Sequence, residues 1–148
     1  MDLILWRHAD AQPGSDDAAR PLTRKGAKQA QRMAEWLEQR LPADARVIVS
    51  PAVRAQQTAE ALGRDSETIA QVNTDATPAE MLKAAGWPDG RGAVVVVGHQ
   101  PALGAVAALV MTGRVAPWRI KKGAVWWICN EPGEATPMLV AVMAPELL

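Results

Sequence analysis

The sequence predicts an α/β fold: a three-layer sandwich with a mostly parallel central sheet and a C-terminal antiparallel hairpin. Short apolar runs alternate with stretches of helical periodicity through most of the chain, and two apolar runs, 125–129 and 138–143, follow one another at its end. Strands that alternate with helices are typical of a sheet covered on both faces. Adjacent strands joined by a polar segment with Pro and Gly are typical of a hairpin. The length of 148 residues predicts a single domain over residues 1–148.

The chain begins with an expected strand and an expected helix. Leu3–Trp6 is an apolar run of strand length. Thr23 is a suitable N-cap for a helix that stops at Pro42, because apolar residues recur at helical spacing after it. These apolar residues are Ala27, Ala30, Ala34, Leu37 and Leu41.

A second strand and helix follow. Arg46–Val49 is a buried strand by its composition, and Ser50-Pro51 places an N-cap residue before a proline at the first helical position. Gly63 is a typical C-terminal stop for the helix that starts there. We expect a weaker strand at Ile69–Val72 and a short helix at Pro78–Ala85.

The third pair of elements contains the most apolar strand. Ala93–Val97 has four consecutive valines, which is typical of a central parallel strand buried on both faces. A helix is expected over Ala102–Met111, with its end near Gly113.

Composition and charge exclude several classes of protein. Sixteen basic and sixteen acidic residues give a net charge of zero, so we expect no general electrostatic binding to nucleic acid or to an anionic membrane. One cysteine and two histidines exclude a disulfide framework and make a metal centre unexpected, and no cofactor is predicted. No apolar run approaches the roughly 18 residues of a membrane span. The N-terminus begins as a buried strand without a basic leader, so a cytoplasmic location is expected.

Three segments that leave predicted strands carry the residues best suited to catalysis. They contain Arg7 and His8, then Arg54 within residues 50–58, and then His99. Because ligands bind beyond the carboxyl ends of the strands in such sheets, we expect these side chains to converge at one edge. Guanidinium groups and helix N-termini bind phosphate oxygens, and a neutral imidazole among them is a nucleophile for phosphorus. Each residue alone has an ordinary structural explanation, as a boundary histidine, a surface ion-pair partner or a helix cap.

Four motifs in order resemble those of the histidine phosphatase superfamily, also called phosphoglycerate mutase-like. Leu3–Ala11 contains an Arg-His pair like the family's Arg-His-Gly signature, and Arg20–Gly26 resembles its Leu-Thr-x-x-Gly segment. Ser50–Ala59 and Val97–Pro101 match its second and third motifs. The short chain and the Arg-Pro-Leu-Thr sequence most resemble the SixA-type phosphohistidine phosphatases.

This resemblance implies a metal-independent phosphatase that acts on phosphohistidine in a signalling protein. It implies that His8 is the nucleophile and forms a phosphohistidine intermediate. It also implies that Arg7, Arg54 and His99 bind the phosphoryl group, or vanadate in its place, and we expect Arg20 at the rim of the site.

Two departures from the family pattern leave alternatives open. Ala9 stands where the family has glycine, and we expect a negative φ there, because only a left-handed backbone would disfavour alanine. The larger members have a carboxylic general acid in a region where this chain has Asp75 and Glu80, which we interpret as turn or cap residues. The alternatives are a phosphatase for small phosphate esters or diphosphates, and a non-catalytic phosphohistidine-binding module.

Overall fold

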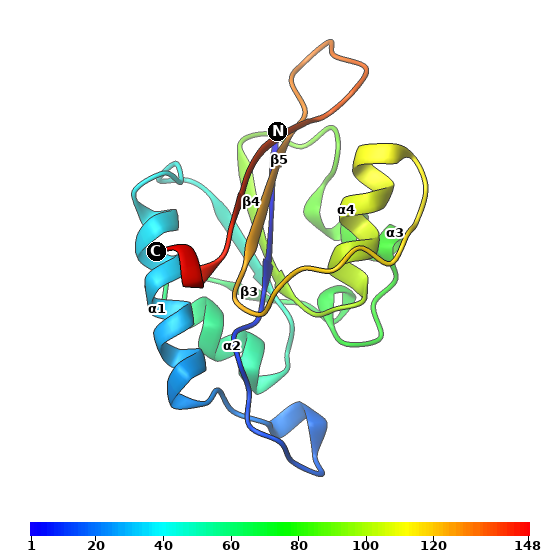
Figure 1. The fold of residues 1–148 in the computed structure, drawn as a ribbon. Helices are drawn as coiled ribbons and strands as arrows, with labels where there is room; N and C mark the ends of the chain where they lie inside the picture. The colour runs from blue at the N-terminus through cyan, green and yellow to red at the C-terminus, as the bar shows by residue number, and fades with distance from the viewer.

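The computed structural model describes all residues from 1 to 148 and contains a six-stranded sheet between two layers of helices (Figure 1). In chain order, the elements are β1 (Asp2–Arg7), α1 (Arg24–Glu38), β2 (Arg46–Val49), α2 (Val53–Glu60), β3 (Glu67–Thr68), α3 (Pro78–Ala85), β4 (Ala93–Gly98), α4 (Ala102–Thr112), β5 (Val125–Cys129) and β6 (Met138–Met143). Short 3₁₀ helices lie at Asp17–Ala19, Ala70–Val72 and Pro145–Leu147. No helix has both the length and the apolar character needed to cross a membrane.

The sheet is parallel except at one edge. Its strand order is β3-β2-β4-β1-β5-β6, and the first four strands of that order run parallel. β5 pairs antiparallel with both β1 and β6, which confirms the predicted hairpin. In the parallel register, Arg7 is opposite Gly98 and Val49 is opposite Val97. The carboxyl ends of β1, β2 and β4 therefore meet at one edge of the sheet.

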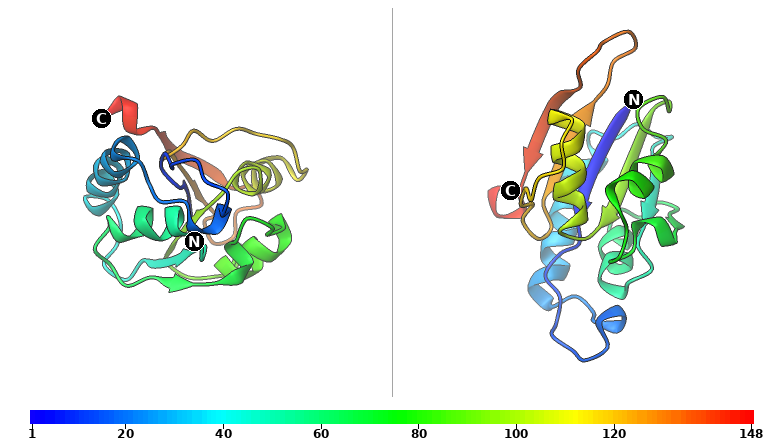
Figure 2. Two further views of the ribbon diagram at one scale, coloured as in Figure 1. Left: turned by 90° about the horizontal axis from the view of Figure 1, so that it is seen from below. Right: turned by 90° about the vertical axis from the view of Figure 1, so that its right-hand side faces the viewer.

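Helices cover both faces of the sheet, as the three-layer prediction requires (Figure 2). One buried cluster joins α1 and α2 to the strands and includes Trp6 and Val97. The other joins α3 and α4 to the opposite face and includes Leu5 and Val96. The consecutive valines of β4 thus alternate between two cores, which explains why its sequence is apolar without interruption.

Helix starts and stops follow the predicted signals in most places. The Thr23 hydroxyl accepts a hydrogen bond from the N–H of Gly26 at 2.9 Å, so Thr23 caps α1 as expected. α3 spans the predicted residues, and α4 ends before Gly113, whose φ is 79°. Ala27, which the helical spacing places on the apolar face of α1, is instead exposed. Met33, which the prediction does not include, is buried in the core.

Four predicted boundaries differ from the structure. α1 ends at Glu38, before the predicted stop at Pro42, and α2 ends at Glu60, short of the predicted stop at Gly63. The helix after β2 begins at Val53, and Ala52 is its N-cap, because the Ser50 hydroxyl binds other groups and does not cap the helix. The strand expected at Ile69–Val72 is displaced: the chain pairs with β2 only at Glu67–Thr68. It then forms a 3₁₀ turn that buries Val72 in the core, where burial of that side chain replaces further pairing.

Candidate active site

His8 directly follows β1 and is held by its neighbours in one orientation. His8 Nδ1 lies 2.8 Å from the carbonyl oxygen of Ala9, and a carbonyl oxygen can only accept a hydrogen bond. Nδ1 therefore carries the proton, and Nε2 has a free lone pair. Arg54 Nε donates to this Nε2 at 3.3 Å. The imidazole thus presents its nucleophilic nitrogen to a guanidinium, where an anionic phosphoryl group would be bound.

The surroundings of His8 keep its imidazole neutral. The residue is 7% exposed. Burial is the largest cause and lowers the pKa of His8 to about 4. The hydrogen bond to Ala9 opposes this shift, and the positive charges of Arg54 and Arg7 add smaller contributions to it. At neutral pH the Nε2 lone pair is therefore unprotonated, as nucleophilic attack requires.

Arg54 lies in the first turn of α2 and is 4% exposed. Besides its bond to His8, it donates from Nη1 to the carbonyl oxygen of Asp17 at 2.7 Å and from Nη2 to the Asp17 carboxylate at 3.1 Å. This salt bridge balances the buried guanidinium with an acid from the segment after β1. The hydrogen bonds from Arg20 and Arg54 hold the pKa of Asp17 below its ordinary value.

His99 follows β4 and faces His8. The two ring centroids are 5.1 Å apart, and the rings are tilted by 54°. His99 Nε2 lies 2.7 Å from the Ser50 hydroxyl, whereas its Nδ1 is buried without a hydrogen-bond partner. When the Ser50 hydroxyl donates to Nε2, Nδ1 carries the proton and is free to donate to a phosphoryl oxygen. Burial, with the charges of His8 and Arg54, lowers the pKa of His99 to about 3.

Arg7 is the last residue of β1 and supplies a second cation. Its Nη1 donates to the carbonyl oxygen of Ile120 at 2.7 Å, which fixes the guanidinium. Its Nε is buried and has no hydrogen-bond partner. Buried polar groups are almost always paired. The buried nitrogen atoms Arg7 Nε and His99 Nδ1 each lack a hydrogen-bond partner, so each is available to donate to an anion.

Arg20 lies farther out than the other predicted residues. It comes from the segment between β1 and α1, which extends beyond the sheet (Figure 1). Its Nε donates to the carbonyl oxygen of Gln12 at 2.7 Å, and its Nη1 donates to Asp17 at 3.0 Å. Arg20 makes no hydrogen bond to His8, Arg54 or His99, but it shares Asp17 with Arg54, and its positive charge contributes to the lowered pKa of His8. This placement agrees with the expected position at the rim.

Ala9 is compatible with the geometry around His8. No residue other than glycine has a positive φ, so the expected negative φ of Ala9 is confirmed. Its N–H donates to the Thr58 hydroxyl at 3.1 Å, and that hydroxyl donates to the carbonyl oxygen of Arg54 at 2.7 Å. Thr58 therefore ties the backbone beside His8 to the helix that carries Arg54.

Neither candidate general acid makes a hydrogen bond or ion pair to the residues expected to bind or attack the phosphoryl group, which are Arg7, His8, Arg54 and His99. Glu80 accepts from the N–H of Thr77 at 3.0 Å and completes a capping box at the start of α3, which confirms its interpretation as a cap. Asp75 makes no hydrogen bond or ion pair to His8 or His99. No group of three or more His, Cys, Asp or Glu side chains is arranged to hold a metal ion.

Sequence reasoning missed one residue of the site and misjudged another. Asp17 lies in an exposed polar segment, and nothing in the local pattern indicates that it pairs with Arg54, 37 residues away. Ser50 was interpreted as a helix cap, whereas its hydroxyl contacts His99. A signal for Ser50 was available, because Ser50 follows a strand that ends beside β4.

Comparisons with known proteins identify relatives of this chain in sequence and in structure. The sequence model described as the histidine phosphatase superfamily (branch 1) matches residues 3–87. The phosphohistidine phosphatase SixA of Escherichia coli K12 is 30% identical, over 92% of this chain and 90% of that protein. A SixA homolog of Haemophilus influenzae is 31% identical, over 73% of this chain and 76% of its own length. A solved structure of the protein histidine phosphatase SixA with tungstate superposes with a TM-score of 0.82 at 26% identity, covering 99% of each chain.

Proposed function

Because this chain belongs to the histidine phosphatase superfamily, we propose that it is a phosphohistidine phosphatase of the SixA type, in which His8 is the nucleophile. The observation that carries the proposal is the state of His8: its Nδ1 is fixed by the Ala9 carbonyl, and its Nε2 lone pair faces a buried guanidinium. The similarity in sequence and structure to SixA proteins supports the reaction class.

In the first step, His8 Nε2 attacks the phosphorus atom of the substrate. A bond forms between Nε2 and phosphorus while the bond from phosphorus to the substrate nitrogen breaks. The leaving group keeps the electron pair of that bond and departs as a neutral imidazole, because its other ring nitrogen carries a proton taken up from solvent. Arg54, Arg7 and His99 donate to the non-bridging oxygens, whose negative charge is concentrated in the transition state. The unpaired nitrogen atoms on Arg7 and His99 support this assignment.

In the second step, water hydrolyses the phosphohistidine formed on His8. The water oxygen bonds to phosphorus, the bond from Nε2 to phosphorus breaks, and one proton of the water passes to phosphate or solvent. His8 returns to its neutral form, and this form is stable at neutral pH because burial lowers the imidazole pKa to about 4.

The leaving group explains the choice of substrate. Phosphohistidine that solvent has protonated on its other ring nitrogen releases a neutral imidazole, whose conjugate acid has a pKa near 6.5. A phosphate ester of serine or a sugar instead releases an alkoxide, which needs a proton from a positioned acid. Glu80 is engaged in a helix cap, and Asp75 makes no contact with His8. A site without a positioned carboxylic acid suits phosphohistidine, and its protein carrier is expected to be a phosphorylated histidine-containing signalling protein.

The test is direct detection of the intermediate. The enzyme is mixed with a histidine-phosphotransfer domain that carries radioactive phosphate on its histidine, and the reaction is stopped in alkaline denaturant, in which phosphohistidine is stable. Label should appear on wild-type enzyme and map to His8, whereas His8→Asn should carry none. His99→Gln is the matched control, because it removes the other imidazole but leaves the nucleophile. Turnover without label on His8, or equal turnover by His8→Asn, would refute the mechanism.

A further inference from the structure

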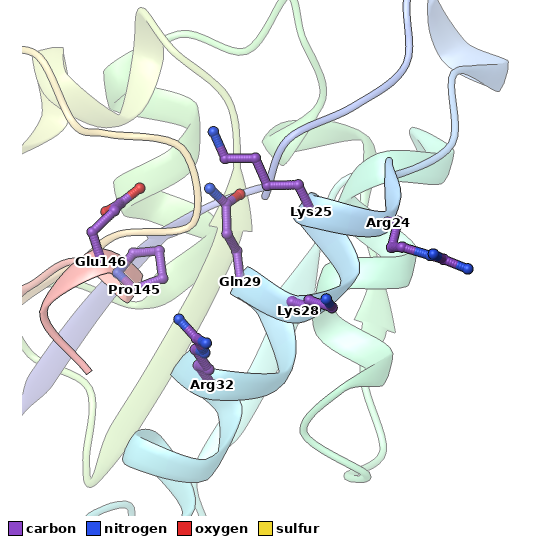
Figure 3. Close-up of a pocket in the computed structure, with 7 residues that line it drawn as sticks. All are labelled: Arg24, Lys25, Lys28, Gln29, Arg32, Pro145 and Glu146. Carbon is purple, nitrogen blue, oxygen red and sulfur yellow. The ribbon is translucent and has the colours of Figure 1, made fainter.

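The N-terminal half of α1 carries cations that the proposed reaction does not use. Lys25, Lys28 and Arg32 are exposed, and their spacing of three and four residues places them on one side of the helix. With Gln29 and the start of the 3₁₀ helix at Pro145–Leu147, they line a groove of about 370 Å³. Figure 3 shows Lys25, Gln29 and Arg32 around this space. We call it the basic groove.

These cations do not serve the stability of α1. None of Lys25, Lys28 and Arg32 forms an ion pair. The first turn of α1 has no acidic residue, although the N-terminus of a helix favours negative charge and disfavours cations. Lys28 and Arg32 are also four residues apart, where like charges repel. Because the whole chain has a net charge of zero, this concentration of cations does not follow from a basic composition.

One residue that lines the basic groove contacts the loop that carries the proposed nucleophile. Gln29 accepts from the N–H of Asp10 at 3.0 Å, and Asp10 lies two residues beyond the proposed nucleophile. The Asp10 carboxylate accepts from Lys122 at 2.9 Å, and the adjacent Lys121 pairs with Glu146 at 3.5 Å. Lys122 therefore contacts the loop after β1, and its neighbour Lys121 contacts a residue that lines the groove. A partner bound in the groove would lie beside the site of phosphoryl transfer.

We propose that the basic groove docks an acidic surface of the protein that carries the phosphohistidine. The proposal rests on the proposed function, because the occupant must present a phosphoryl group to His8 while it lies in the groove. A protein with a phosphohistidine meets this condition, whereas a nucleic acid or a membrane surface does not. Complementary charge beside the site increases the rate of productive encounter and orients the partner.

The test variant removes three of the four positive side chains that line the groove, leaving Arg24, and does not touch the reacting groups. In it, Lys25→Gln, Lys28→Gln and Arg32→Gln are combined. The substrates are an acidic histidine-phosphotransfer domain, phosphorylated with phosphoramidate, and free phosphohistidine. At low salt, kcat/KM for the domain should fall about tenfold or more, because electrostatic attraction is lost. The value for free phosphohistidine should not change. Added salt should lower the wild-type value for the domain toward that of the variant.

A matched control removes the same number of positive charges elsewhere. Lys83, Arg91 and Arg114 are exposed and form no ion pair, so Lys83→Gln, Arg91→Gln and Arg114→Gln are combined in the control variant. This variant should keep the wild-type kcat/KM for both substrates. The groove variant should also unfold at the wild-type temperature or above it, because the removed charges repel one another and the helix N-terminus.

Several results would overturn the docking proposal. The groove variant could keep the wild-type kcat/KM for the phosphorylated domain. Its kcat/KM could also fall equally for both substrates, or fall no more than that of the control variant. Wild-type enzyme inactive on both substrates would instead refute the proposed function. In that case the docking proposal is tested separately by titrating the unphosphorylated acidic domain, which must bind wild type more tightly than it binds the groove variant. Groove-dependent binding of anionic vesicles or duplex DNA without binding of the domain would also overturn it.

Discussion

Acid should destabilise this protein through its two buried imidazoles, and the size of the effect follows from their surroundings. The pKa of His8 is lowered from 6.5 to about 4, and that of His99 from 6.5 to about 3. At pH values between the folded-state pKa of each imidazole and 6.5, the unfolded chain binds a proton that the folded chain does not. The free energy of unfolding therefore falls as the pH decreases from about 6.5. For His8 the loss is complete below the folded pKa of about 4, where both states are protonated.

The magnitude follows from the linkage between proton binding and folding. Between pH 7 and pH 5, each imidazole should remove about 2 kcal/mol from the free energy of unfolding, and both together about 4 kcal/mol. The perturbation is the double variant His8→Asn/His99→Gln. Asn keeps a donor near the Nδ1 position that binds the Ala9 carbonyl, and Gln keeps a polar atom near the Nε2 position that binds Ser50.

The assay is urea unfolding at both pH values, followed by the fluorescence of the six tryptophans, in buffers without phosphate. From pH 7 to pH 5, the free energy of unfolding of wild type should fall by about 4 kcal/mol more than that of the double variant. Each single variant should account for about half of this difference. Carboxylates with lowered pKa values, such as Asp10 and Asp17, contribute equally to both proteins and cancel. Equal losses in wild type and double variant would show that the imidazoles accept protons in the folded state at pH 5. Burial would then not be what keeps His8 neutral.

Three further predictions concern catalysis. Arg7→Ala and Arg54→Ala should each lower kcat for phosphohistidine by about 10²-fold or more, as loss of a transition-state donor does; near-normal rates in both would place the reaction elsewhere. Across substrates ordered by leaving-group pKa, phosphohistidine should react fastest, then aryl esters, then alkyl esters, and Asp75→Asn or Glu80→Gln should barely change the phosphohistidine rate. A flat dependence that collapses in either variant would instead favour a phosphatase for small esters. Excess chelator should leave turnover unchanged, whereas loss of turnover that magnesium or zinc restores would contradict a metal-independent mechanism.

The sequence by itself determined the order and type of almost all elements, because the signals for these are local. Alternation of apolar runs with helical periodicity identifies the layers, and Thr23 and Gly113 mark helix ends through their own chemistry. The expectation that His8 and His99 meet also follows from sequence. Both follow buried parallel strands, and the carboxyl ends of such strands share one edge.

The tertiary structure alone decided what those side chains contact and how they are charged. Asp17 reaches Arg54 because the segment after β1 folds back over α2, and no local pattern encodes that path. Ser50 binds His99 because β2 and β4 end side by side, so the hydroxyl that local propensity assigns to a helix cap has another partner. The low pKa values of the two imidazoles arise from burial and from cations contributed by distant segments. Hydrogen bonds to distant partners, burial and electrostatic fields depend on distances in space, and these are set only when the whole chain has packed.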